Sequence, residues 1–318
     1  MTNSTRTGQC GSFDDDFPST ANGKTCDKLL GSVLVICTVI GVSGNATALG
    51  YFRSTKRKDL ATLLYLAVSC IDICTSIAHF PVTFTLFVER QPLLFSNEAF
   101  CGTWFFVSYC LQLLSMFLVM LMTVSRTVAS AFPFYEVSTK RVVGAFLLQC
   151  LVLVLLIILA TVWAREFFYA TDAAFCDVTM EDTGFALFIS IFFTVELAIP
   201  PVVIFFSFVI CLVKLSKPTP SAASQEYNRQ AAVTVTMFTG IFMCCNLPHF
   251  TNILLYLIGK LIADWSCNPF HSTQFMYWYA WPVSVIVFTV LNATLNPILY
   301  YCRMSGFKEW LSRGSTAS

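Results

Sequence analysis

Four polar side chains within long apolar stretches of the sequence have the types and spacing of a cation site. Asp72 and Ser115 each lie near the middle of such a stretch, and Asn292 and Asn296 lie four residues apart in the last one. A carboxylate with hydroxyl and amide oxygens suits a hard cation such as sodium. The alternative is that these groups only join neighbouring helices by hydrogen bonds, and residue type alone favours that alternative.

The last stretch, Leu291–Tyr300, also contains Pro297 directly after Asn296. A polar segment with a proline kink is tolerated inside a membrane only where neighbouring helices satisfy its backbone groups. We therefore expect this stretch to be buried in protein, and its kink indicates a part that moves.

The elements that must position these residues are membrane spans. The chain has 318 residues, of which 56% are hydrophobic and 12% charged, whereas soluble domains carry roughly 25% charged residues. A span requires about 20 apolar residues. The sequence predicts an all-α membrane protein, a bundle of seven transmembrane helices near residues 29–52, 60–88, 102–125, 142–164, 185–213, 231–258 and 275–301.

The basic residues predict the orientation of this bundle. With the N-terminus outside, 13 of the 19 Lys and Arg residues fall in inner loops and the C-terminal tail, as expected for cytoplasmic segments. Residues 1–28 then form an extracellular tail without a signal-peptide core, residues 29–301 the bundle, and residues 302–318 a cytoplasmic tail. We expect a short amphipathic helix on the membrane surface at Phe307–Leu311 and glycosylation at Asn3.

Disulfides are expected on the outer side, where the environment is oxidising. A bridge between Cys101 and Cys176 would tie the loop before the fifth span across the mouth of the bundle. For the remaining outer cysteines we favour Cys26–Cys267 over Cys10–Cys26, although sequence does not fix connectivity.

Several motifs recur in one order along these spans, and with them the chain resembles a rhodopsin-like (class A) G-protein-coupled receptor. Cys101 lies 25 residues before Arg126, the family's spacing between the bridge cysteine and the arginine that ends the third helix. The other motifs are Gly44-Asn45, Leu66-Ala67 with Asp72, Cys245-x-Leu247-Pro248 after Phe242, and Asn296-Pro297-Ile298-Leu299-Tyr300 followed by Phe307.

The resemblance assigns roles to these residues. It implies an allosteric sodium ion at Asp72, Ser115, Asn292 and Asn296, and it thereby favours the cation site over simple helix association. It also implies coupling to a heterotrimeric G protein through a switch formed by Arg126, Pro248, Pro297 and Tyr300.

The sequence departs from the family at two parts of that switch. Ser125 stands where the family has an acidic residue before Arg126. The loss of this acid predicts elevated basal signalling or weakened coupling, unless Ser125 and nearby carbonyls hold Arg126 instead. Asn246 replaces the aromatic residue of the sixth helix. The fourth span lacks the family's Trp, and the fifth lacks its Tyr.

The ligand is expected in the outer half of the bundle. Ser108 stands where amine receptors carry Asp, and Val290 stands where opsins carry the retinal-binding Lys, so retinal linkage is excluded. Outer segments hold 12 acids against 6 bases, which favours a cationic ligand. The candidate contacts are His79, Ser108, Tyr109, Gln112, Glu196, Asn246, His249 and Asn252.

Two of these contacts have structural alternatives. Glu196 would contact a cationic or hydrogen-bonding group of the ligand, or it is protonated or capped by a neighbouring helix. His249 is more often a satisfied core residue than a ligand contact.

Together these features predict a multi-pass receptor of the plasma membrane that binds an extracellular peptide or polar small molecule. Its partners are that ligand, membrane lipid and a G protein, with no nucleic acid, since the net charge is only +1. No nucleophile–base pair indicates an enzyme. The alternatives are a seven-helix binder with weak or no coupling, and a transporter, for which the expected repeated halves are missing.

Overall fold

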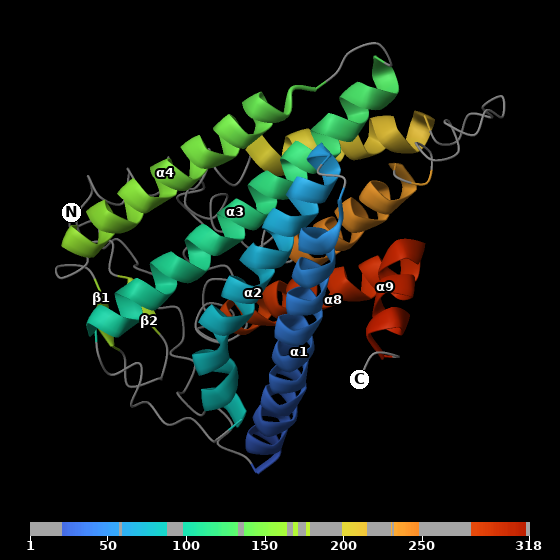
Figure 1. The fold of residues 1–318 in the computed structure, drawn as a ribbon. Helices are drawn as coiled ribbons and strands as arrows, with labels where there is room; N and C mark the ends of the chain where they lie inside the picture. Colours follow the sequence, from blue (N-terminus) through green and yellow to red (C-terminus); the bar gives the residue numbers. More distant parts are fainter. Residues whose placement is uncertain are drawn as a thin grey trace, which may run out of the picture.

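The structure is a computed structural model that describes residues 21–56, 59–87, 98–132, 137–163, 168–170, 176–178, 199–214, 230, 232–247 and 281–315. Figure 1 shows long helices packed as a bundle. The labelled elements are α1 (Ala21–Ser54), α2 (Leu60–Phe87), α3 (Glu98–Ala131), α4 (Thr139–Trp163), β1 (Phe168–Ala170), β2 (Cys176–Val178), α8 (Trp281–Arg303) and α9 (Ser305–Ser315). The apolar helices Ile199–Lys214 and Ala232–Leu247 lie in the fifth and sixth predicted runs, and we call them the fifth-run and sixth-run helices.

The described helices confirm helical structure in all seven predicted runs. α1 and α3 begin before the predicted starts of their runs, at Ala21 and Glu98. Within the described ranges, three segments are long and apolar enough to cross a membrane, namely Lys28–Ser54, Leu60–Pro81 and Cys110–Ala129. Helices suit such segments because they satisfy every backbone group internally.

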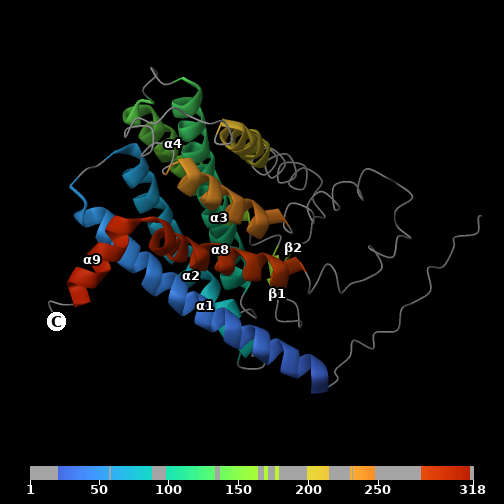
Figure 2. The ribbon, with the colours of Figure 1, turned by 90° about the vertical axis from the view of Figure 1, so that its right-hand side faces the viewer.

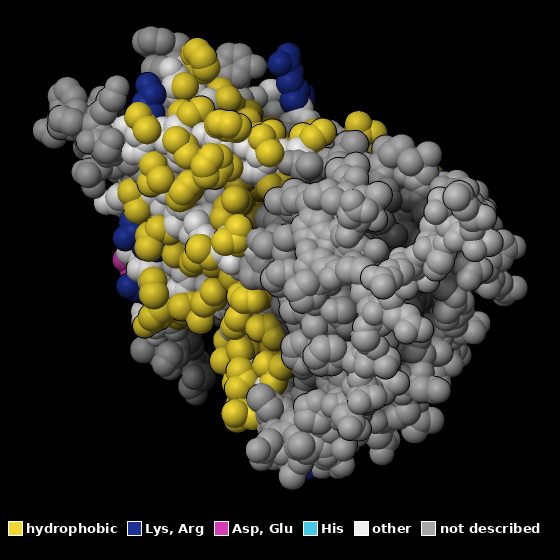
Figure 3. All heavy atoms as spheres, turned by 180° about the vertical axis from the view of Figure 1, so that it is seen from behind, with side chains coloured by type: hydrophobic (Ala, Val, Ile, Leu, Met, Phe, Trp, Pro, Cys, Tyr) yellow, Lys and Arg dark blue, Asp and Glu magenta, His cyan; other side chains and the backbone are white. Residues whose placement is uncertain are grey.

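Apolar side chains cover much of the outside of the bundle. On α4, Leu147, Leu148, Leu151 and Ile158 are all more than half exposed, and Figure 3 shows hydrophobic side chains spread over the described part of one face. A soluble protein rarely exposes contiguous apolar patches of this kind. The face is therefore suited to contact with lipid.

The helix contacts place α2 between α1, α3 and α8. α1 packs along α2 and α8, α2 also contacts α3 and α8, and α3 contacts α4; Figure 2 shows α1 passing beside α2 and α8. Polar residues of α2, α3 and α8 line one cavity in the interior.

A close contact joins α1 to the kink of α8. A Cβ atom on Gly44 would lie 2.7 Å from Cγ of Pro297, so only glycine allows this approach. Pro297 has no N–H to pair with the carbonyl four residues earlier, which belongs to Ala293. The side chain of Asn45 supplies the missing donor, with its Nδ2 2.8 Å from that oxygen.

The helix α9 follows α8 and packs on the end of α1. Phe307 is buried, and its ring centroid lies 5.3 Å from that of Tyr51, while Trp310 lies 6.0 Å from the same tyrosine. Lys308 and Glu309 are exposed. One side of α9 is thus apolar and packed and the other charged, as predicted for this segment; its position on a membrane surface stays a prediction.

One element was missed by the all-α prediction. β1 and β2 form an antiparallel pair in which the backbone of Tyr169 is in register with that of Asp177, and the pair packs against α3, near its first residues in Figure 1. Strands of three residues are too short to produce a recognisable alternating pattern, which explains the omission.

Candidate functional site

The carboxyl group of Asp72 joins α2 to α8. Asp72 is 2% exposed, and its Oδ2 accepts a hydrogen bond of 2.6 Å from Nδ2 of Asn296. A buried carboxyl group needs partners of this kind, since unpaired burial is unfavourable. The carbonyl oxygen of the same amide, Asn296 Oδ1, is buried without a hydrogen-bond partner.

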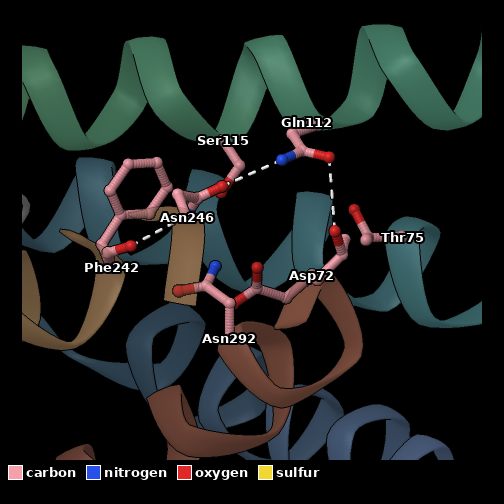
Figure 4. A pocket seen from close by; sticks show the side chains of 8 residues that line it. Asp72, Thr75, Gln112, Ser115, Phe242, Asn246 and Asn292 are labelled. Carbon is pink, nitrogen blue, oxygen red and sulfur yellow. Dashed lines mark hydrogen bonds between the residues drawn. The ribbon is translucent and has the colours of Figure 1, made fainter. Parts of the chain in front are cut away.

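A cavity of about 10 Å³ adjoins Asp72, the size that holds one water molecule or small ion. Figure 4 shows side chains of α2, α3, α8 and the sixth-run helix around it. The lining residues are Asp72, Thr75, Gln112, Ser115, Phe242, Asn246, Thr289 and Asn292.

The donor set of this cavity fits a hard cation. It combines the Asp72 carboxyl with two buried oxygens that lack hydrogen-bond partners, Thr75 Oγ1 and Asn292 Oδ1, and with the Ser115 hydroxyl. Three of the four predicted ligands thus line one cavity, while Asn296 lies behind it as a partner of Asp72. Thr75 was missed by sequence reasoning, although its place one turn after Asp72 on α2 was a usable signal.

Next to this cavity, a hydrogen-bonded triad links three helices. Nε2 of Gln112 on α3 donates to Oδ1 of Asn246 at 2.9 Å, and the hydroxyl of Thr289 on α8 donates to Oε1 of Gln112 at 3.2 Å. Nδ2 of Asn246 donates to the carbonyl of Phe242. Figure 4 shows two of these bonds meeting at the Gln112 side chain. Gln112 and Asn246 were predicted as ligand contacts, and here they bond to each other.

The predicted outer contacts lie between α2 and α3. The imidazole Nδ1 of His79 is 2.8 Å from the carbonyl oxygen of Thr75, and the His79 ring lies edge-on to Trp104 at 6.0 Å. The Ser108 hydroxyl is buried with no hydrogen-bond partner. Ser108 therefore retains an unused hydrogen-bonding group. Glu196, Pro248, His249, Asn252 and the side chain of Tyr109 lie outside the described residues.

At the end of α3 that is predicted to lie inside, Arg126 has no acidic partner among the described residues. Ser125 donates its hydroxyl to the carbonyl of Met122 at 2.8 Å. No ion pair of Arg126 occurs within the described ranges, where Arg313 and Glu309 of α9 form an exposed pair. Ser125 therefore bonds to its own helix, and no bond between Ser125 and Arg126 occurs among the residues that the structure describes.

Tyr300 is buried in a cluster of aromatic rings. It is 0% exposed, and its ring centroid lies 5.2 Å from Phe52, 5.5 Å from Tyr65 and 6.4 Å from Phe238. Tyr300 thus faces the protein interior. It therefore joins α1, α2, α8 and the sixth-run helix.

The predicted bridge between Cys101 and Cys176 stays a prediction, because both side chains lie outside the described part of the chain. Their elements are close, since Cys176 belongs to β2 and this strand packs against α3. Cys10, Cys267 and Asn3 fall outside the described ranges, as does the side chain of Cys26. The nine described cysteines are free thiols: Cys37, Cys70, Cys74, Cys110, Cys150, Cys211, Cys244, Cys245 and Cys302.

Comparison with known proteins agrees with this geometry. The chain is 23% identical to a mouse protein described as a putative purinoceptor, over 90% of this chain and 87% of that protein. It is 24% identical to human melanocortin receptor 5, over 89% of this chain and 84% of the receptor. The fold matches squid rhodopsin with a TM-score of 0.64 at 17% identity, covering 91% of this chain and 85% of the rhodopsin.

The model of the 7 transmembrane receptor (rhodopsin family) matches residues 44–300, which include Gly44, Asp72, Arg126 and the Leu291–Tyr300 stretch. This match confirms the resemblance inferred from the motifs. The chain belongs to the rhodopsin family of seven-transmembrane receptors, which are multi-pass receptors of the plasma membrane and not enzymes.

Proposed function

We propose that this receptor binds an extracellular ligand in the outer half of its bundle and activates a heterotrimeric G protein. One observation carries the proposal, namely a continuous set of buried polar contacts through the middle of the bundle. The triad of Gln112, Asn246 and Thr289 shares a cavity with Asp72, and Asp72 is bonded to Asn296, next to the kink at Pro297. A change at the triad would therefore reach the segment that contains Tyr300.

The described residues favour a polar ligand. The buried Ser108 hydroxyl lacks a partner, and Gln112, four residues later on α3, carries an amide. A ligand group that bonds to Gln112 would compete with Asn246 and loosen the sixth-run helix. The acidic outer segments of the sequence, with Glu196, favour a cationic or peptide ligand. One relative is named a purinoceptor and another a melanocortin receptor, so we take the ligand class from this chain's own residues.

We further propose that the cavity beside Asp72 holds a sodium ion. The carboxyl of Asp72, the hydroxyls of Ser115 and Thr75 and the free oxygen of Asn292 would hold it. When bound, sodium supplies a positive charge that compensates the buried carboxylate. The orphaned oxygens of Thr75 and Asn292 support this site, because buried polar atoms are rarely left without partners.

The G protein would meet the end of the bundle that contains Arg126. Exposed basic side chains occur at the helix ends near it, which supports an inner location for this face and an extracellular N-terminus. They are Arg53, Lys56, Lys140, Arg141, Lys214, Arg303, Lys308 and Arg313. Binding of ligand would shift the population towards a bundle whose sixth-run helix has moved away from α3.

The test is a ligand screen read out by G-protein activation in cells, weighted towards peptides and polar cationic metabolites. Asp72→Asn and Glu196→Gln run beside the unchanged receptor. We expect a hit whose response is weakened by both variants. A hit that binds at the cell surface without recruiting any G protein would contradict the coupling half of the proposal.

A second candidate, a seven-helix binder that does not couple, is favoured by one observation. Arg126 lacks the acidic neighbour of the family motif, and no described residue forms an ion pair with it. The same experiment separates the two functions, because a non-coupling binder gives saturable surface binding and no nucleotide exchange.

A further inference from the structure

A second hydrogen bond joins α3 to the sixth-run helix, closer to the inner end of the bundle than the Gln112–Asn246 bond. The hydroxyl oxygens of Thr123 and Thr239 lie 2.9 Å apart. Thr123 is 1% exposed and Thr239 is 0% exposed. Water does not reach this bond, so it is stronger than the same bond at a wet surface.

The two hydroxyls have fewer protons than they have possible hydrogen-bond acceptors. Thr123 Oγ1 lies 2.7 Å from the carbonyl oxygen of Val119, and Thr239 Oγ1 lies 2.8 Å from that of Val235. Each hydroxyl has one proton. One threonine therefore donates to its own helix while the other donates across the interface, and either can take each role. The interhelical bond can thus form in two ways, with either Thr123 or Thr239 as the donor across the interface.

The surroundings of this pair are apolar. Val119, Met122, Val235 and Phe238 are each 1% exposed and belong to one core cluster. If the helices separate here, each hydroxyl still has its own backbone carbonyl, but the bond across the interface is lost. The bond between the two threonines therefore stabilises only the packed arrangement. In the separated arrangement both hydroxyls still donate to backbone carbonyls, so neither donor is left unsatisfied.

A neighbouring threonine extends the contact to the fifth-run helix. The Thr127 hydroxyl lies 3.2 Å from the carbonyl oxygen of Ser207 and 3.3 Å from Sγ of Cys211. Thr123 and Thr127, four residues apart on one face of α3, thus contact the two helices that border its inner half. These contacts carry no formal charge.

We propose that Thr123 and Thr239 form a neutral clasp that restrains the inner end of the sixth-run helix in the resting receptor, where Arg126 forms no ionic clasp with any described residue. The inference rests on the proposed function, because the clasp restrains the motion that would admit a G protein. Thr239 lies seven residues before Asn246 on the same helix. An outward movement of the inner end would therefore separate Thr239 from α3 sooner than it would break the Gln112–Asn246 bond.

The experiment measures the separation of the two helices directly, without a G protein. The full chain, in lipid nanodiscs, carries a spin-labelled ketone amino acid at the exposed positions Ala129 on α3 and Met237 on the sixth-run helix. Electron-spin distance measurements then give the populations of near and far arrangements for Thr239→Val, which removes the hydroxyl and keeps the shape, and for Thr239→Ser, which retains it.

Thr236→Val is the matched control on the same helix. The Thr236 hydroxyl is buried with no hydrogen-bond partner, so its removal tests the general effect of replacing a buried threonine. We expect Thr239→Val to raise the ratio of far to near arrangements about fivefold, as the loss of one buried hydrogen bond predicts. Thr239→Ser and Thr236→Val should keep the ratio of the unchanged receptor.

The pair must also behave as a unit. We expect Thr123→Val combined with Thr239→Val to shift the ratio no further than either variant alone. An unchanged ratio in Thr239→Val, or an equal shift in Thr236→Val, would overturn the clasp. Nucleotide exchange is measured on the same samples. A shifted ratio without exchange on any G protein supports the clasp and contradicts the proposed coupling, so the two failures are distinguishable.

Discussion

The α1–α2–α8 side of the bundle and the seam between α3 and the sixth-run helix are both buried and polar, but different chemistry stabilises them. On the first side, a carboxyl group bonds to Asn296 and a glycine lies against Pro297. On the seam, the contacts are an amide pair at Gln112 and a hydroxyl pair at Thr123. The first side keeps the family's motifs, whereas the seam departs from them at Ser125 and Asn246.

This difference indicates where the receptor can change its shape. The contact of Gly44 with Pro297 leaves no room for a larger side chain, and Asn45 satisfies the carbonyl that the kink exposes. The seam has single neutral bonds, each worth about 1 kcal/mol. A ligand of ordinary affinity supplies enough differential binding energy to shift an equilibrium of that size.

The largest effect is expected on the α1–α2–α8 side of the bundle. Gly44→Val places side-chain atoms where the ring of Pro297 already lies, so α1 and α8 must separate, at about 3 kcal/mol of lost stability. The measurement is the thermal unfolding midpoint of the purified receptor in detergent. Gly144→Val on α4 is the control, since a Cβ there meets nothing within 4 Å. Equal loss in both variants would refute the close contact.

The next effect is expected at the triad. Gln112→Leu removes the partner of Asn246 and the acceptor of Thr289, leaving buried groups unsatisfied, and should lower stability by about 2 kcal/mol. The same unfolding assay reports it, with Thr236→Val as the control for loss of an unpartnered polar group. If Gln112→Leu unfolds at the midpoint of the unchanged receptor, the triad contributes nothing to the seam.

A smaller effect is expected from sodium. At free sodium about tenfold above its Kd, the unchanged receptor should gain about 1.4 kcal/mol of stability over potassium buffer. Asp72→Asn should abolish that gain, whereas Asp59→Asn, at the start of α2 where Asp59 accepts the N–H of Thr62, should retain it. Melting curves in sodium and potassium chloride measure the difference, and a gain that persists in Asp72→Asn would disprove the site.

The smallest effect is expected at the inner end of α3. Ser125→Asp restores an acidic neighbour for Arg126, and an exposed or half-exposed ion pair of this kind contributes about 0.2–1 kcal/mol. Ligand-free signalling should fall by up to about fivefold, and the uncharged Ser125→Asn should leave it higher than Ser125→Asp does. An unchanged basal level would show that an acid at this position does not restrain the receptor.

Much of the structure of the α1–α2–α8 side could be predicted from the sequence. Long apolar runs identified the spans, and the Asn296-Pro297 motif and Asp72 identified the polar core, because charged and kinked residues are conspicuous in apolar runs. The finer roles were not predicted. Asn296 is the residue that donates to Asp72, and this partner is determined by the packing of α8 on α2.

The seam was harder to predict because its residues look ordinary in the sequence. Thr38 and Thr234 bond only to the carbonyl four residues earlier in the bonds that the structure records, as threonines in helices commonly do. Thr123 and Thr239 form the same local bond and also meet across the interface. No sequence pattern distinguishes these two cases, since the difference depends on how α3 and the sixth-run helix are placed.

The central claim is that the receptor couples to a G protein and that a neutral clasp restrains it. The most direct test places the receptor in nanodiscs without ligand and measures nucleotide exchange on purified heterotrimeric G proteins. We predict exchange above the receptor-free background, about fivefold faster for Thr239→Val than for Thr236→Val. The central claim would be contradicted if exchange stayed at background for every G protein tested and Thr239→Val were no faster than Thr236→Val.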